Sequence, residues 1–302
     1  MAESRAGFAA LIGEPNVGKS TLLNRLVGSK VSIVTHKVQT TRSRIRGVAI
    51  HGEAQIVLVD TPGLFEPRRR LERAMVKAAW AALGDADAAV LLIEANKGIT
   101  EGVAEIMDTL DGGISGLPAL AVAVNKVDRV RPEQLLPLAD ALGQYKFLDA
   151  VFLISAASGS GLDGLLDWLA GRLPPGPWLY PADQIADSPM RFLAAEITRE
   201  KLLLRLHQEI PYQLTVETES WKELRDGSVR IEQVVYVARE SHRRIAVGPK
   251  GETIKSICIA SRKDIEMLVG SRAHLFLRVK LREKWMEESS RYAEMGLDYA
   301  EK

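Results

Sequence analysis

The chain has 302 residues, of which 46% are apolar and 26% charged, and its formal net charge is only +1. This length and apolar content exclude a disordered or collagen-like chain and allow two compact domains, each with its own core. A single cysteine, Cys258, excludes an intramolecular disulfide and fits a reducing compartment. The first residues lack a secretory signal pattern, and no apolar run has the length of a membrane span, so we expect a cytoplasmic protein.

Short apolar runs in the first half of the chain have the character of buried strands. They lie at residues 8–13, 55–60, 89–95, 119–125 and 150–156. Helical stretches alternate with them, at residues 19–27, 75–84 and 164–173. Near-continuous apolar strands separated by helices indicate a mostly parallel sheet covered on both faces. We therefore predict an α/β domain over residues 1–174.

The first apolar run leads into the segment GEPNVGKS, residues 13–20, which opens the helix at 19–27. This is the spacing of a P-loop, whose backbone N–H groups and helix N-terminus cradle the β-phosphate of a nucleotide. Lys19 supplies positive charge to the β- and γ-phosphates, and Ser20 offers a hydroxyl to Mg²⁺. The motif predicts nucleotide contacts from Gly13, Asn16, Val17, Gly18, Lys19, Ser20 and Thr21.

A second motif, DTPG at residues 60–63, stands at the end of the strand at 55–60. A carboxylate at this position can reach Mg²⁺ through water, which is the role we predict for Asp60. The N–H of Gly63 would approach the γ-phosphate. The next residue is Leu64, so the glutamine that orients the attacking water in small signalling GTPases is absent, and intrinsic hydrolysis should be slow.

Between these two motifs lies a polar, basic segment, residues 31–50, where a switch loop should close on the γ-phosphate. One of its two adjacent threonines, Thr40 or Thr41, is expected to ligate Mg²⁺. The TTR arrangement is similar to that of potassium-activated GTPases in which the second threonine is the ligand, and this favours Thr41. The arginines at 42, 44 and 46 fit a solvated edge strand and a contact with RNA or a partner equally well.

Asn16 leaves two alternatives open. Together with backbone carbonyls of the switch loop, its side chain could hold a K⁺ ion between the α- and γ-phosphates, in place of an arginine finger. Alternatively, it only stabilises the turn of the P-loop. We favour the first alternative, which makes K⁺ an expected second cation beside Mg²⁺.

The motif NKVD at residues 125–128 ends another strand and predicts which base binds. Guanine presents an N1–H and an N2 amine as paired donors, which the carboxylate of Asp128 can accept. Adenine has no such pair and would leave the carboxylate unpaired at a cost in free energy.

The segment Ser155-Ala156-Ala157 follows the last strand, where a backbone N–H can contact the guanine oxygen. Guanine contacts are therefore expected from Asn125, Lys126, Asp128, Ser155, Ala156 and Ala157. The motifs together predict a GTP-hydrolysing enzyme with catalytic residues Lys19, Thr41, Asp60 and Gly63.

Five of the thirteen prolines lie between Pro174 and Pro189, and their density breaks any helical or strand period. We predict an interdomain linker at residues 175–189. Its aromatic residues, Trp178 and Tyr180, are expected to pack on a neighbouring surface and not to bind a ligand.

After the linker, a helix at 190–206, strand-like runs at 212–224 and 228–240, and a strand at 274–283 predict a small α+β domain over residues 190–302. The sequence GPKG at 248–251 precedes a further helix. Such a GxxG loop lets a nucleic-acid backbone approach closely, because neither glycine carries a Cβ atom. Residues 243–282 also contain ten lysines or arginines but only three acidic residues. Such a local excess of positive charge can bind phosphates.

The GxxG segment resembles a KH RNA-binding domain. RNA contacts are expected from Arg243, Arg244, Gly248, Pro249, Lys250, Gly251 and Lys255. In the helix that follows the loop, Ile254, Ile257 and Cys258 are expected to form the buried face, which makes Cys258 a core residue and not a reactive thiol.

Together, the segments GEPNVGKSTLLNRL, KVQTTRSRIRG, DTPG, NKVD, SAASGSGLDGL and GPKGETIKSI, with RKDIE downstream, resemble the bacterial Era family of GTPases over nearly all 302 residues. The resemblance implies a P-loop GTPase joined to a type II KH domain that binds the 3′ end of small-subunit (16S) ribosomal RNA. It implies an assembly and maturation factor for the small ribosomal subunit. Pro249 departs from relatives that more often have another residue there, so RNA affinity or base preference is expected to differ.

The expected partners are GTP or GDP, the small-subunit RNA and the assembling subunit, and we expect a monomer. A weak peripheral membrane association is an alternative that the acidic tail at 285–302 disfavours.

The leading function is an RNA-assembly switch, in which GTP changes how the KH domain is presented and hydrolysis permits release. A GTPase serving RNA modification would need a modifying domain, and no cofactor or nucleophile pattern follows the linker. A passive RNA-binding module is disfavoured by the intact Lys19, Ser20, Asp60, Asn125 and Asp128.

Overall fold

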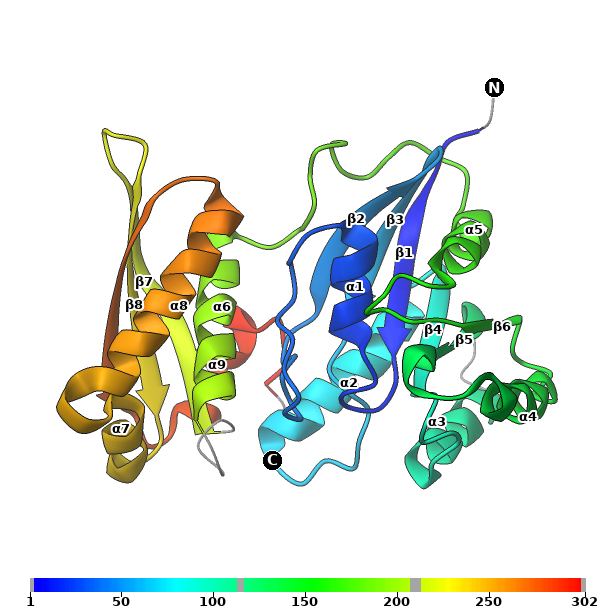
Figure 1. Ribbon diagram of the computed structural model, residues 1–302, viewed down its shortest axis with the longest axis horizontal. Coiled ribbons are helices and arrows are strands. Elements are labelled where there is room, and N and C mark those ends of the chain that lie inside the picture. The colour runs from blue at the N-terminus through cyan, green and yellow to red at the C-terminus, as the bar shows by residue number, and fades with distance from the viewer. Residues whose placement is uncertain (1–2, 113–116, 207–212, 300–302) are drawn as a thin grey trace. The chain divides into compact units, whose positions relative to one another are not determined.

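The computed structural model describes residues 3–112, 117–206 and 213–299 (Figure 1). The chain forms two compact units. The first comprises residues 1–32, 41–187 and 295–302, and the second comprises residues 33–40 and 188–294. The short segment Ile33–Thr40 therefore groups with the second unit, although both of its sequence neighbours belong to the first.

The first unit is built on a six-stranded sheet with the strand order β2-β3-β1-β4-β5-β6. Its strands are β1 (Arg5–Ile12), β2 (Ile45–His51), β3 (Ala54–Asp60), β4 (Ala88–Glu94), β5 (Ala119–Asn125) and β6 (Ala150–Leu153). All neighbouring strands are parallel except β2, which pairs antiparallel with β3 at one edge. The predicted α/β class with a mostly parallel sheet is confirmed.

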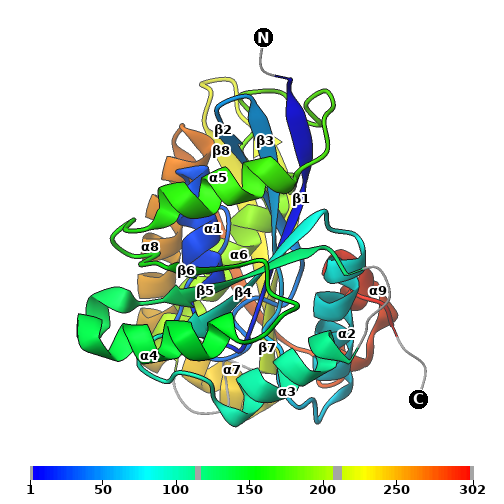
Figure 2. The ribbon, with the colours of Figure 1, turned by 90° about the vertical axis from the view of Figure 1, so that its right-hand side faces the viewer.

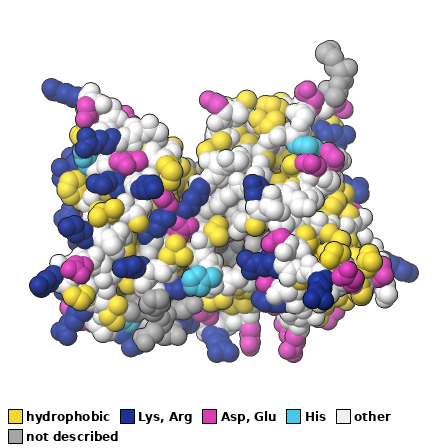
Figure 3. All heavy atoms as spheres, in the orientation of Figure 1, with side chains coloured by type: hydrophobic (Ala, Val, Ile, Leu, Met, Phe, Trp, Pro, Cys, Tyr) yellow, Lys and Arg dark blue, Asp and Glu magenta, His cyan; other side chains and the backbone are white. Residues whose placement is uncertain are grey.

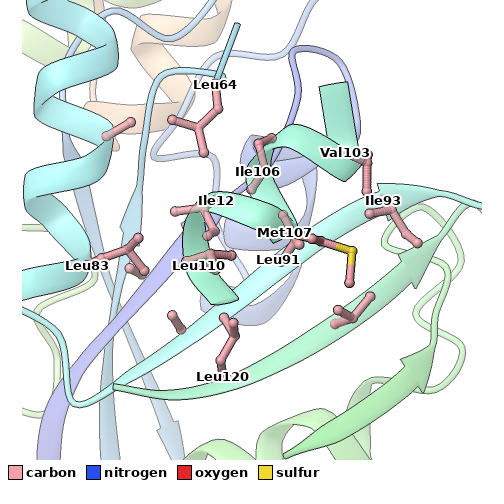
Figure 4. Packing of buried hydrophobic residues seen from close by; sticks show 14 of the residues in the cluster. Ile12, Leu64, Leu83, Leu91, Ile93, Val103, Ile106, Met107, Leu110 and Leu120 are labelled. Atoms are coloured by element: carbon pink, nitrogen blue, oxygen red, sulfur yellow. The ribbon is translucent and has the colours of Figure 1, made fainter. Parts of the chain in front are cut away.

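Helices cover both faces of this sheet (Figure 2). They are α1 (Lys19–Val27), α2 (Arg70–Gly84), α3 (Glu101–Asp111), α4 (Pro132–Gly143) and α5 (Leu162–Arg172), with a short 3₁₀ turn, η1 (Val127–Arg129). One core cluster joins α2, α3 and α4 to one sheet face, where Leu83 and Ile106 pack with Ile12 and Leu91 (Figure 4). Because both faces are covered, every residue of β3 and β4 is buried, which explains their continuous apolar sequence.

The predicted linker is fixed to the first unit over most of its length. The buried side chain of Gln55 in β3 accepts hydrogen bonds from the N–H groups of Leu179 and Tyr180 and donates one to the carbonyl of Tyr180. Trp178 donates its indole N–H to the carbonyl of Glu53, at 3.0 Å. The hydroxyl of Tyr180 donates to the carboxylate of Asp187 at 2.9 Å, so both aromatic side chains contact residues of the first unit.

The second unit contains a three-stranded sheet with two long helices. Its elements are α6 (Met190–Arg205), β7 (Leu214–Glu223), β8 (Val229–Val237), α7 (Glu240–Val247), η3 (Pro249–Gly251), α8 (Glu252–Val269), β9 (Ala273–Leu281), η4 (Trp285–Glu287) and α9 (Ser289–Glu294). The central strand β8 pairs antiparallel with β7 and parallel with β9. Apolar side chains of α6 and α8 pack together with the sheet. The α+β prediction is confirmed, while Tyr212, the expected start of the first strand, lies outside the described residues.

The segment Ile33–Thr40 contacts helix α6 of its own unit. The N–H of Val34 donates to the carboxylate of Glu200 at 2.9 Å, and the guanidinium of the buried Arg199 donates to the carbonyl of Thr40. Two successive residues of one helix therefore hold both ends of the segment.

Candidate active site and nucleic-acid interface

The predicted P-loop connects β1 to α1 and depends on two glycines with positive φ. A Cβ atom on Gly13, whose φ is 137°, would lie 2.4 Å from the carbonyl oxygen of Leu92. One on Gly18, whose φ is 107°, would lie 2.3 Å from Nδ2 of Asn125. The same Nδ2 donates to the carbonyl of Val17 at 2.8 Å. The loop is therefore packed directly against the last residue of β5, and no larger side chain fits at either glycine.

Lys19 opens α1 and is buried beneath the loop. Its Nζ donates to the carbonyl oxygens of Gly13 at 3.0 Å and Glu14 at 2.9 Å. Burial lowers the pKa of Lys19 from 10.5 to about 8, and the charges of Asp60 and Glu14 oppose that shift. Phosphate oxygens beside this amine would favour its charged form, so the loop holds a cation that gains from an anionic ligand.

Three hydroxyl groups converge on the carboxylate of Asp60, which ends β3 and is fully buried. Oδ2 of Asp60 accepts from Ser20 Oγ at 2.6 Å, from Ser32 Oγ at 2.7 Å and from Thr41 Oγ1 at 3.3 Å. Burial raises the pKa of Asp60, while the hydrogen bond from Ser20 and the charge of Lys19 lower it. In the described part of the chain, the other oxygen, Oδ1, has no hydrogen-bond partner. A buried carboxylate with an unsatisfied oxygen beside hydroxyls fits a hard cation such as Mg²⁺.

The two threonines of the switch segment lie in different surroundings. Thr41 Oγ1 is 2.9 Å from Ser20 Oγ and so belongs to the Asp60 cluster. The hydroxyl of Thr40 instead contacts Thr35 Oγ1 and donates to the carbonyl of Lys37, both at 2.6 Å. The structure thus brings Thr41 to Ser20 and Asp60, as the sequence predicted. Within the described ranges, no group of three or more His, Cys, Asp or Glu residues could hold a metal ion.

The DTPG loop touches the P-loop. A Cβ atom on Gly63 would lie 2.7 to 2.9 Å from atoms of Pro15, and the N–H of Leu64 donates to the carbonyl of Gly13 at 3.0 Å. This contact excludes larger residues at Gly63 and places its backbone beside the loop that would hold the phosphates.

The predicted base-binding segments follow β5 and β6 and are joined by hydrogen bonds. Oδ1 of the buried Asn125 accepts from the N–H of Ala156 at 2.9 Å. Ser155 Oγ donates to Asp128 Oδ1 at 2.5 Å, which fixes the orientation of this exposed carboxylate. Arg25 of α1 donates to the carbonyl of Ala157. The structure therefore gathers the predicted residues of both segments at the edge of the sheet that carries the P-loop. Thr21 lies in the first turn of α1.

The arginines of the switch segment are engaged within the first unit. Arg44 donates to the carbonyl of Ala78 and pairs with Asp85 at 3.1 Å. Arg46, in edge strand β2, pairs with Asp187 at 3.0 Å, and Arg42 is buried. Of the three arginines, only Arg46 lies in the edge strand and is exposed, whereas Arg42 and Arg44 precede the strand.

Two residues of this site were not predicted from the sequence. Ser32 donates to Asp60, and Glu94 contacts Lys126 at 3.0 Å. No local pattern marks Ser32. The one available signal for Glu94 is an acidic residue that ends an otherwise apolar strand.

In the second unit, the GxxG segment joins α7 to α8. A Cβ atom on Gly248 would lie 2.1 Å from Thr253 Oγ1, and Gly248, Lys250 and Gly251 all have positive φ, of 75°, 49° and 77°. The side chain of Lys250 is exposed at the tip, and so are those of the predicted contacts Pro249, Arg243, Arg244 and Lys255. Arg243 also pairs with Glu240 at 3.3 Å. Lysine and arginine side chains cover much of the visible face of this unit (Figure 3).

Beside this loop, α8 and strands β8 and β9 form an open groove of about 490 Å³. Lys255 and Ile259 line it from α8, and Phe276 and Arg278 line it from β9. The strand residues are not among the RNA contacts predicted from the sequence, although the alternation of Phe276, Arg278 and Lys280 along one strand face is a usable signal. Cys258 also lines the groove and donates to the carbonyl of Leu275 at 3.3 Å. Of the three residues predicted to form the buried face of α8, Ile257 is buried, whereas Ile254 and Cys258 are only partly buried because they line the groove. Burial raises the pKa of the Cys258 thiol.

The described helices include none that is long and apolar enough to cross a bilayer.

Comparison with protein families matches residues 8–126 to the 50S ribosome-binding GTPase family and residues 209–286 to the KH domain family. GTPase Era from Dinoroseobacter shibae is 60% identical over 299 residues, which are 99% of this chain and 97% of that protein. GTPase Era from Sinorhizobium medicae is 58% identical over 98% of this chain and 94% of that protein.

Two solved structures are similar to nearly the whole chain. A crystal structure of Era in complex with MgGDPNP and nucleotides 1506–1542 of 16S ribosomal RNA superposes with a TM-score of 0.91. It is 36% identical and covers 99% of this chain and all of its own. A variant of Aquifex aeolicus Era bound to GDP and AlF₄⁻ has a TM-score of 0.90 at 36% identity, covering 98% of this chain and all of its own. On its motifs, its two units and these relatives, the chain belongs to the Era family of GTPases and carries a KH domain after its GTPase domain.

Proposed function

We propose that this GTPase binds Mg²⁺ and GTP at the loops after β1, β3, β5 and β6, and binds the 3′ end of 16S ribosomal RNA through its KH domain. It thereby acts as an assembly and maturation factor for the small ribosomal subunit. The observation that carries the proposal is the convergence of the four motifs on one sheet edge, in a chain similar throughout to an Era that was crystallised with MgGDPNP and 16S RNA.

In the proposed nucleotide site, the backbone from Gly13 to Thr21 cradles the phosphates, and Lys19 places its ammonium on the β- and γ-phosphates. Ser20 and Thr41 would ligate Mg²⁺ directly, and Asp60 would do so through water. The ion would neutralise charge that develops on the phosphates. The unsatisfied Oδ1 of Asp60 and the neighbouring hydroxyls support this assignment.

For hydrolysis, we propose that the N–H of Gly63 donates to the γ-phosphate while a water molecule attacks its phosphorus. The bond from phosphorus to the bridging oxygen of GDP breaks, and the proton of the water passes to the released phosphate. Leu64, which follows Gly63, is apolar and buried and cannot orient the water. We therefore expect catalysis to rest on positioning and charge neutralisation, which gives a slow intrinsic rate.

We propose that Asn16 and a K⁺ ion supply the missing charge between the α- and γ-phosphates. Asn16 has a φ of 65°, a conformation that asparagine tolerates better than most residues. Glycine also adopts this φ, so a substitution can remove the carboxamide and keep the backbone turn. GTP hydrolysis should be at least about tenfold faster in KCl than in NaCl at equal ionic strength, which is about 1.4 kcal/mol of activation free energy. Asn16→Gly keeps the turn and removes the carboxamide, so it should erase the difference. Equal rates in both salts for the unaltered protein would rule out K⁺.

For RNA, we propose that Arg243, Arg244, Lys250 and Lys255 contact phosphates while Gly248, Pro249 and Gly251 let the RNA backbone pass close to the loop. The adjacent groove would receive the bases, with the exposed ring of Phe276 as a stacking surface. Arg230 lies over this ring, 4.5 Å from its centroid, and so orients it.

We propose that the switch segment links the nucleotide state to the KH domain. Thr41 shares hydrogen bonds with Ser20 and Asp60, while the preceding residue, Thr40, is held by Arg199 of α6. A γ-phosphate that draws Thr41 toward Mg²⁺ would therefore pull on residues 33–40, which belong to the second unit. We propose that this pull changes how the KH domain is presented, and that hydrolysis permits release of the RNA.

We further propose a GTPase domain at residues 1–174, a linker at 175–189 and a KH domain at 190–302, in a cytoplasmic monomer. Weak membrane association stays a prediction.

The proposed function can be tested by crosslinking the protein to RNA in cells and sequencing the attached fragments. Fragments should concentrate at the 3′ end of 16S ribosomal RNA and in particles that contain the small subunit. Fragments drawn mainly from RNA substrates of modifying enzymes would instead favour a role in RNA modification. Lys19→Ala provides a control. It should change how much of the protein accumulates on particles that contain the small subunit, without changing which RNA the protein binds.

A further inference from the structure

The last residue of β4, Glu94, is a carboxylate at the end of a strand that is otherwise apolar. Its side chain is only 8% exposed. Strand β4 lies between β1 and β5, and Glu94 pairs in register with Asn125. This residue is therefore placed between the strand that leads into the P-loop and the strand that ends in the base-binding motif.

The contacts of Glu94 connect these two loops. Its Oε2 lies 3.0 Å from Nζ of Lys126, which belongs to the NKVD motif. The same Nζ donates to the carbonyl oxygen of Asn16, at the tip of the P-loop, at 2.8 Å. Both Lys126 and Asn16 have left-handed backbones, with φ of 66° and 65°. One ammonium group thus ties a left-handed position of the base loop to a left-handed position of the phosphate loop.

We infer that Glu94 is a positioning residue for the guanine nucleotide, because it holds the Lys126 ammonium on the P-loop and so sets the spacing between the phosphate-binding and base-binding loops. This inference rests on the proposed nucleotide site. A nucleotide spans both loops, so a fixed spacing lowers the ordering cost of binding.

The ionisation of Glu94 agrees with this role. Burial raises the pKa of Glu94, but hydrogen bonds and charges from Lys126 and Lys97 outweigh burial and hold the pKa below its ordinary value. The group is therefore a carboxylate at neutral pH. Its shielded position makes the ion pair with Lys126 stronger than one between exposed side chains.

The chain offers a matched control in Lys97. Its Nζ lies 3.1 Å from the same Oε2, but its side chain is half exposed and belongs to neither loop. Removing Lys97 therefore deprives Glu94 of one ion pair without releasing Lys126. If Glu94 only neutralised charge at the strand end, the loss of either lysine would have similar effects.

The test uses the full chain and fluorescent GDP and GTP, with the variants Glu94→Gln, Lys97→Met, Lys126→Met and the double variant Glu94→Gln with Lys126→Met. Glu94→Gln keeps the side-chain shape and removes its charge. We expect it to raise the Kd for GDP and GTP equally, by about tenfold, through faster dissociation. The kcat at saturating GTP should stay within about twofold. The lost contact stabilises the bound ground state and the transition state of hydrolysis equally. Lys97→Met should stay within about twofold in Kd.

The double variant should bind no more weakly than Lys126→Met alone, because Glu94 acts through Lys126. Unchanged affinity of Glu94→Gln, or additive losses in the double variant, would overturn the inference while leaving the proposed guanine site in place. Unchanged affinity of Lys126→Met would instead contradict the proposed site itself. Two measurements verify that each variant is folded. Thermal unfolding without nucleotide should match that of the unaltered chain, and RNA affinity should stay within about twofold.

Discussion

Replacing Asp128 by asparagine should move the base preference of this GTPase from guanine to xanthine. The carboxylate of Asp128 is proposed to accept from the N1–H and the N2 amine of guanine, and an amide cannot accept both. Because Ser155 Oγ donates to Asp128 Oδ1 at 2.5 Å, the amide oxygen of asparagine can keep this contact and direct its NH₂ group to the base. That donor faces the carbonyl that xanthine has in place of the N2 amine.

The expected loss of GTP affinity is about 100-fold or more. A hydrogen bond to a charged group contributes about 1.5–3 kcal/mol, and each 1.4 kcal/mol is a factor of ten in Kd. Competition of GDP and xanthosine diphosphate against a fluorescent nucleotide measures both affinities in one preparation. Asp128→Ala is the matched control, because it should lose guanine affinity without gaining xanthine affinity. If Asp128→Asn retained full GTP affinity, Asp128 would not be the base-reading residue.

Changing Pro249 and Lys250 together to aspartate should abolish RNA binding and leave the GTPase activity nearly unchanged. The two carboxylates would stand where the RNA backbone is proposed to pass, and they would repel its phosphates. The fold should survive, because Gly248 and Gly251 remain at their positive φ angles and both altered side chains are exposed. Aspartate also tolerates the φ of 49° at position 250 better than most residues do.

We expect a loss of at least about 100-fold in affinity for a single-stranded RNA that carries the small-subunit 3′ end, with GTP turnover within about twofold. Residual binding should depend less steeply on salt, because fewer phosphates are neutralised. Leu224→Asp with Arg225→Asp makes the same change in net charge in the β7–β8 turn, at the opposite end of the second unit from α7 (Figure 1). That control should retain most of the RNA affinity. Undiminished RNA binding by the loop variant would leave strand β9 as the next candidate interface.

The sequence by itself determined which residues are proposed for both sites, because these residues lie close together in short segments. Each nucleotide motif directly follows a short apolar run with the character of a strand, and three of these strands, β1, β3 and β5, are largely buried, whereas β6 is only partly buried. Parallel strands bring their carboxyl ends to one edge of a sheet, so the gathering of Lys19, Asp60 and Asp128 could be predicted without knowing the strand order. The GxxG loop was equally local, since its two glycines are separated by only two residues.

Only the tertiary structure decided which further residues lie beside these proposed sites. The choice of Thr41 beside Ser20 and Asp60, with Thr40 held by Arg199, depends on how the switch segment folds back, and two adjacent threonines carry no local signal that separates them. The pairing of Glu94 with Lys126 required the position of β4 between β1 and β5. Such contacts join residues that are far apart in the chain. They depend on strand order and side-chain packing, and the local periodicity of the sequence encodes neither.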